Sequence, residues 1–89
     1  MTQRQEKILK KAIESYGLRH QAMITAEECG ELLTALSHFL RGRESDTGRI
    51  ITELADVSIM VEQLALHFGY DEFLKERTRK IERLKERMK

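Results

Sequence analysis

The sequence contains no proline and only one cysteine, Cys29. Proline is the residue that most strongly breaks a helix from within, so its absence leaves helices free to run until a glycine or a polar turn ends them. We therefore expect an all-α chain. A single cysteine excludes a disulfide within the chain, and we expect Cys29 to be a small packing residue.

Long apolar stretches and an excess of one charge are also missing. No apolar run approaches the roughly 18 residues needed to cross a membrane, and the first residues lack the apolar region of a signal peptide. We expect a cytoplasmic protein without a membrane partner. The formal net charge is +1, whereas a general nucleic-acid binder carries a clear basic excess, so no nucleic-acid partner is expected.

The 89 residues suffice for one domain, and apolar spacing predicts four helices in it. They cover residues 3–16, 19–41 and 48–68, with a last helix that follows Asp71 as its N-cap and ends near residue 88. Ser45, Asp46 or Thr47 is expected to cap the third helix. Phe39, Phe68 and Phe73 are expected to fill the core.

The third helix is apolar on almost every side. A helix with this pattern is buried on almost every side, and so short a chain has too few other residues to cover it. We therefore expect a homo-oligomer, either a dimer or a tetramer.

Two short acidic motifs stand out, one on the second expected helix and one on the third. They are Glu28-Cys29-Gly30-Glu31 and Glu53-Leu54-Ala55-Asp56. Carboxylates three residues apart share one helix face, with Cβ atoms roughly 5 to 6 Å apart. The motifs lie equally far from Gly42, in the expected turn, so an antiparallel hairpin brings them to one height.

Four carboxylates that meet between packed helices repel one another, so they require a cation or a basic partner. Ligands that are all oxygen suit Mg²⁺ or Mn²⁺, and Mg²⁺ often binds substrate phosphates as well. The alternative is that these acidic groups are ordinary solvated surface residues. No Walker-type phosphate loop is present, so a bound triphosphate would be held by metal and side chains.

At these residues the sequence resembles the MazG-like branch of the all-α nucleoside triphosphate pyrophosphohydrolases. That family has a Glu-x-x-Glu motif followed by Glu-x-x-Asp, and the similarity covers about residues 16–68. The resemblance implies Mg²⁺-dependent cleavage of a nucleoside triphosphate between its α- and β-phosphates, which yields a nucleoside monophosphate and pyrophosphate. It also implies that the enzyme removes non-canonical or surplus nucleotides. It implies a four-helix bundle assembled across subunits, and it implies metal-binding and catalytic roles for Glu28, Glu31, Glu53 and Asp56.

The resemblance also implies that basic residues of the last helix contact the phosphates. Lys80, Arg83 and Arg87 are the candidates. The alternative is that these side chains pair with glutamates of their own helix and keep it solvated. His20 and Gln21 are either surface residues or contacts to a base or sugar.

Two other functions fit the same pattern. Phosphoribosyl-ATP pyrophosphohydrolases have a related helical fold, but a Tyr-His pair typically follows their Asp motif, where this chain has Ile59-Met60. A non-catalytic helical oligomerisation or regulatory module is the third candidate. Such a module would keep the acidic cluster as a structural cation site or a relic.

Overall fold

The computed structural model describes residues 1–42 and 47–89 and contains four α-helices. They are α1 (Gln3–Tyr16), α2 (Leu18–Leu40), α3 (Thr47–Phe68) and α4 (Tyr70–Arg87). No strand occurs among the described residues. The expected all-α class is confirmed, and each expected helix agrees with an observed one to within two residues at either end.

Local sequence explains where the helices begin and end. At the start of α1, Thr2 and Gln5 form a capping box, in which each side chain accepts a hydrogen bond from the backbone N–H of the other, at 3.0 and 2.9 Å. The α3–α4 turn depends on Gly69, whose φ of 144° is unfavourable for any residue with a Cβ atom. Gly69 is also the N-cap of α4, so the expected cap Asp71 was wrong and lies in the first helical turn.

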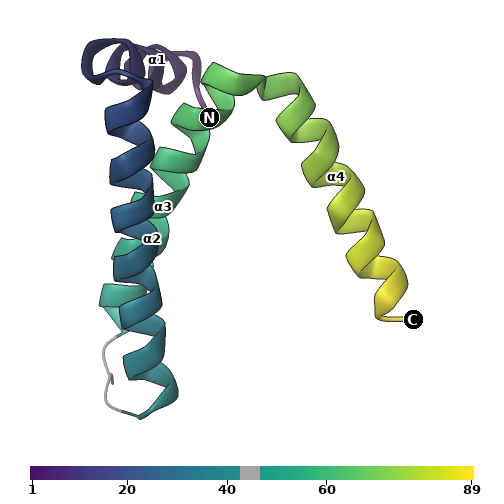
Figure 1. Cartoon of the computed structure of the whole chain (residues 1–89). Helices are drawn as coiled ribbons and strands as arrows, with labels where there is room; N and C mark the ends of the chain where they lie inside the picture. Colours follow the sequence, from purple (N-terminus) through teal and green to yellow (C-terminus); the bar gives the residue numbers. More distant parts are fainter. Residues whose placement is uncertain (43–46) are drawn as a thin grey trace.

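Helices α2 and α3 form an antiparallel hairpin, and α1 and α4 both lie at the end of it that is far from the α2–α3 turn (Figure 1). α2 and α3 pack along most of their length, and α1 lies across the end far from their connecting turn. α4 leaves that same end and diverges from α3 (Figure 1). Ser45 and Asp46, two of the expected caps, lie outside the described residues, and Thr47 is the first residue of α3.

The core is small. Its buried apolar residues within the described chain are Ile13, Ala35, Met60 and Ala65. Phe39 and Phe68, which were expected to fill the core, are largely exposed within this single chain, and Cys29 is exposed as well. None of the helices in residues 1–42 and 47–89 is long and apolar enough to cross a bilayer.

Candidate metal centre

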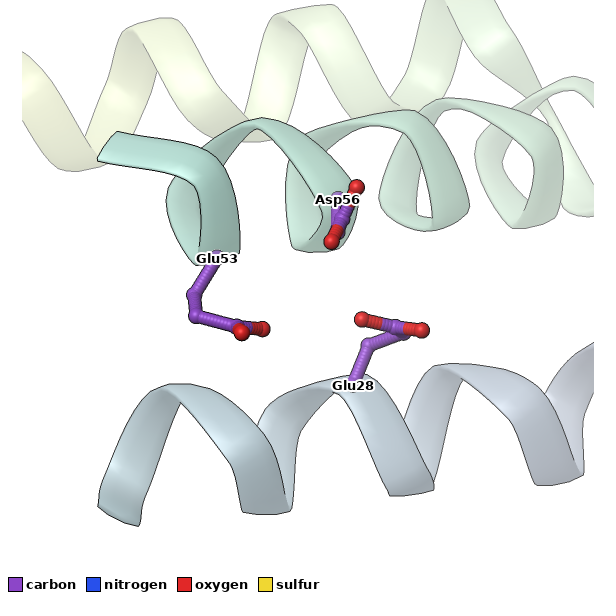
Figure 2. A group of neighbouring side chains, drawn as sticks. All are labelled: Glu28, Glu53 and Asp56. Carbon is purple, nitrogen blue, oxygen red and sulfur yellow. The ribbon is translucent and has the colours of Figure 1, made fainter. Parts of the chain in front are cut away.

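Three carboxylates converge between α2 and α3. Glu28 comes from α2, and Glu53 and Asp56 come from α3, one turn apart (Figure 2). One oxygen from each of the three lies within 4.8 Å of the others. The antiparallel hairpin therefore brings the two sequence motifs to one height, as their equal distance from Gly42 predicts.

The carboxylates of Glu28 and Glu53 lie in an unfavourable electrostatic environment. Desolvation raises the pKa of Glu28, and the charges of Glu31, Asp56 and Glu53 raise it further. Desolvation also raises the pKa of Glu53, and the charges of Glu31 and Asp56 raise it further. The charge of Arg49 lowers this pKa, but by a smaller amount. Both residues thus bind protons more readily than an isolated glutamate does.

Each of these two glutamates also has a buried oxygen without a hydrogen-bond partner among the described residues. The atoms are Glu28 Oε2 and Glu53 Oε2. A buried carboxylate oxygen without a donor is costly, because it has lost its water and gained nothing in return. A divalent cation would remove this cost, and carboxylate oxygens are the ligands that Mg²⁺ and Mn²⁺ prefer. The residues therefore fit such an ion.

Glu31, the fourth expected ligand, lies at the exposed edge of the cluster. It follows Glu28 by one helical turn, and its carboxylate is not within the close group of three. Its charge nevertheless raises the pKa of Glu28 and of Glu53 more than any other charge does, and a side-chain hydrogen bond with Glu31 raises both pKa values further, so Glu31 interacts directly with both. The structure thus brings three of the four predicted carboxylates together and places Glu31 beside them.

The three basic residues proposed to contact phosphates are not brought to this cluster within the chain. Lys80, Arg83 and Arg87 belong to α4, which among the helices of residues 1–42 and 47–89 packs only against α3, near the turn that joins the two helices (Figure 1). Lys80 Nζ instead lies 3.9 Å from Glu76 Oε1 on the same helix. For Lys80, the alternative of an intrahelical ion pair is the one that the structure shows.

Sequence reasoning missed a buried polar contact on the same helix faces. Gln21 precedes Glu28 by seven residues and Gln63 follows Asp56 by seven, so both lie two turns from the carboxylates, in the α2–α3 interface. Gln21 Nε2 donates to Gln63 Oε1 at 2.8 Å, and the two residues are only 5% and 4% exposed. Gln21 Oε1 also lies 2.8 Å from His20 Nδ1.

A spacing signal could have identified this pair. Residues seven apart on a helix share a face, so two amides placed symmetrically about the acidic motifs predict a contact across the hairpin. The glutamines extend the polar part of the α2–α3 interface away from the carboxylates. Gln21 is therefore a buried structural residue, and the surface location considered for it was wrong.

Comparison with known proteins does not add to this description of the site. The chain was compared with protein-family models, with curated proteins and with solved structures, and none of them matches it.

Proposed function

We propose that the protein is a Mg²⁺-dependent nucleoside triphosphate pyrophosphohydrolase that acts in the cytoplasm and removes unwanted nucleotides. One observation supports this most directly. Glu28, Glu53 and Asp56 converge from two helices, and two of them keep a buried oxygen that lacks a donor among the described residues. The resemblance of both acidic motifs to those of MazG-like enzymes gives the same function.

Glu28, Glu53 and Asp56 would hold the ion, with Glu31 at the open side. Bound there, Mg²⁺ or Mn²⁺ would supply positive charge for a triphosphate and would make an attacking water more acidic. Glu31 is exposed and lies beside the other three, which supports the proposal that its carboxylate would orient that water and accept its proton. Attack on the α-phosphorus, with pyrophosphate as the leaving group, gives a nucleoside monophosphate.

We also infer that the enzyme works as a homo-oligomer whose helical bundle is completed across subunits. The supporting observation is the amount of apolar surface on α3 that its own chain leaves open. Ile51, Leu54 and Phe68 are each at least half exposed. Exposed apolar groups in such number mark a surface that another protein covers.

Incubating the protein with Mg²⁺ and a panel of ribo- and deoxyribonucleoside triphosphates, followed by ³¹P NMR, tests the proposed reaction. Monophosphate and pyrophosphate are the expected products, whereas a diphosphate and free phosphate would contradict cleavage at the α–β bond. Phosphoribosyl-ATP belongs in the panel. Turnover of that compound alone would identify a phosphoribosyl-ATP pyrophosphohydrolase. No turnover of any compound would contradict both enzymatic functions and favour the non-catalytic helical module.

A further inference from the structure

The proposed reaction needs more positive charge than a divalent ion can supply. The three converging carboxylates and Glu31 place four acidic side chains at the site, and one such ion returns only two positive charges. A bound triphosphate adds further negative charge, so a basic side chain beside the ion is needed to offset it. Within residues 1–42 and 47–89, Lys80, Arg83 and Arg87 of α4 are not brought to this place.

One arginine of the two helices that form the site lies next to the carboxylates. α2 and α3 carry a single Lys or Arg each, which is Arg19 on α2 and Arg49 on α3. Arg19 precedes Glu28 by nine residues, roughly 13 Å along the helix, whereas Arg49 precedes Glu53 by only four, roughly 6 Å. Residues four apart share a helix face, so Arg49 lies one turn from Glu53 on the face that carries the site.

A residue of α2 contacts this arginine across the hairpin. Arg49 Nη1 lies 3.4 Å from His38 Nδ1, and both residues are nearer than the acidic motifs to the turn between α2 and α3. A guanidinium only donates hydrogen bonds, so His38 Nδ1 accepts and the proton of the imidazole lies on Nε2. The contact restricts the long arginine side chain, which lowers the entropy that it loses when it binds a ligand.

The charge of Arg49 acts on the carboxylate cluster. It lowers the pKa of Glu53, whereas desolvation and the charges of Glu31 and Asp56 raise it. The guanidinium is therefore close enough to attract an anion that shares an ion with these carboxylates. An arginine fork can give two parallel hydrogen bonds to phosphate oxygens, which a lysine cannot do.

We propose that Arg49 binds the β- and γ-phosphates of the substrate and that His38 positions its guanidinium. An ion held by Glu28, Glu53 and Asp56 would lie about one helical turn farther from the hairpin turn than Arg49 does. The α-phosphate would then lie at the carboxylates, and the β- and γ-phosphates would extend toward the α2–α3 turn. This inference rests on the proposed function and names the side chain that the chain itself supplies to the phosphates.

Arg49 would act on the leaving group of the reaction. The oxygen of water forms a bond to the α-phosphorus and its proton passes to Glu31. The bond from that phosphorus to the bridging oxygen breaks, and pyrophosphate leaves with the electron pair. Negative charge thus grows on the pyrophosphate, and a guanidinium already in place stabilises it.

Isothermal titration calorimetry with inorganic pyrophosphate and Mg²⁺ tests the contact without any turnover. Arg49→Gln should bind pyrophosphate about tenfold or more weakly than the wild type, because hydrogen bonds between charged groups are lost. Arg19→Gln is the matched control, since it removes the same charge from an exposed position of α2 far from the carboxylates, and it should bind as the wild type does. Arg49→Lys keeps the charge without the fork, so its affinity should lie between those of Arg49→Gln and the wild type.

His38 and the ion provide two further readouts. His38→Leu removes the acceptor and should weaken pyrophosphate binding by less than Arg49→Gln does, and His38→Asn, which restores an acceptor, should recover it. Mn²⁺ binding without pyrophosphate should be as tight in Arg49→Gln as in the wild type, or tighter, because a positive charge has been removed beside the site. A variant that had merely lost its structure would bind Mn²⁺ more weakly.

Two results would overturn the proposal. The first is a wild-type protein that binds no pyrophosphate in the presence of Mg²⁺, and the second is Arg49→Gln binding pyrophosphate as tightly as Arg19→Gln. Failure of the proposed reaction alone would look different. Pyrophosphate binding that depends on Arg49, without turnover of any nucleoside triphosphate, would support the phosphate contact and contradict only the hydrolase activity.

Discussion

Glu53 lies on α3, whose other side chains are mostly apolar, and its carboxylate faces Glu28 across the helix pair (Figure 2). The sequence alone predicted this placement, because an acidic residue on an apolar helix needs a reason and a motif on the paired helix lies at the same height. The sequence did not predict that Glu31 would lie at the edge. Helical spacing puts residues on a face but does not fix how their side chains are directed.

At this scale the first prediction concerns Glu53→Gln. The amide keeps the shape of the side chain but loses the negative charge that a divalent ion requires. We therefore expect turnover to fall by more than the ~10–100-fold that is typical when a residue that supports a metal ligand is lost. Glu27→Gln is the matched control, since Glu27 is exposed and outside the close group of three. Equal activity in the two variants would remove Glu53 from the site.

The second prediction concerns pH and follows from Glu28 and Glu53. Their pKa values lie above the ordinary 4.5 in the folded chain, so between pH 4.5 and the raised values the native state holds more protons than the unfolded state. The free energy of unfolding of the metal-free protein should therefore rise as the pH falls from neutral through this window. The opposite shift, the lowered pKa of Glu76 beside Arg79, acts below pH 4.5 and does not interfere.

Thermal unfolding followed by circular dichroism, with and without Mg²⁺, checks this pH dependence. Bound Mg²⁺ replaces the protons as the source of compensating charge, so it should stabilise the protein at neutral pH and flatten the profile. Glu53→Gln should flatten the metal-free profile as well. A metal-free profile in which stability instead increases toward neutral pH would contradict the raised pKa values.

At the scale of helices, most of the fold was predictable and the polar contacts between helices were not. The absence of proline, the glycines at helix ends and the apolar spacing locate all four helices. The Gln21–Gln63 contact joins residues 42 positions apart, and it depends on how α2 and α3 are rotated about their axes. The divergence of α4 depends in turn on the backbone angles at Gly69, which no periodicity in the sequence encodes.

The third prediction tests the buried amide pair. Gln63→Met removes the acceptor of Gln21 Nε2 and leaves a buried donor unpaired, which should cost about 1–3 kcal/mol of unfolding free energy. Replacing both glutamines by methionine removes the donor too, so the double variant should lose less than the single variant. Urea denaturation of the wild type, Gln21→Met, Gln63→Met and the double variant measures these changes in the free energy of unfolding. Simple additivity of the two single changes would show that the pair is not coupled.

At the scale of the molecule, the decisive feature is how little one chain buries. The over-apolar third helix predicts a partner from the sequence, and the structure leaves Leu33 and Phe68 at 68% and 73% exposure. What the sequence could not provide is which apolar residues one chain leaves open, because this depends on how α1, α2 and α3 pack on one another.

The fourth prediction is that stability depends on protein concentration. If folding and pairing are coupled, each tenfold increase in concentration should add about 1.4 kcal/mol per dimer to the apparent free energy of unfolding. Denaturation midpoints measured at several concentrations test this, and Leu33→Glu should abolish the dependence. A wild-type midpoint that does not change with concentration would show that the single chain is the folding unit.

The cation site is tested most directly by titrating Mn²⁺ into the metal-free protein and following the free ion by electron paramagnetic resonance. The three converging carboxylates, with two buried oxygens that lack a donor among the described residues, predict at least one bound ion per chain at neutral pH. Binding should compete with Mg²⁺, persist in Glu27→Gln and disappear in Glu53→Gln. A wild-type protein that binds no Mn²⁺, or that binds it equally well after Glu53→Gln, would contradict a metal centre between α2 and α3.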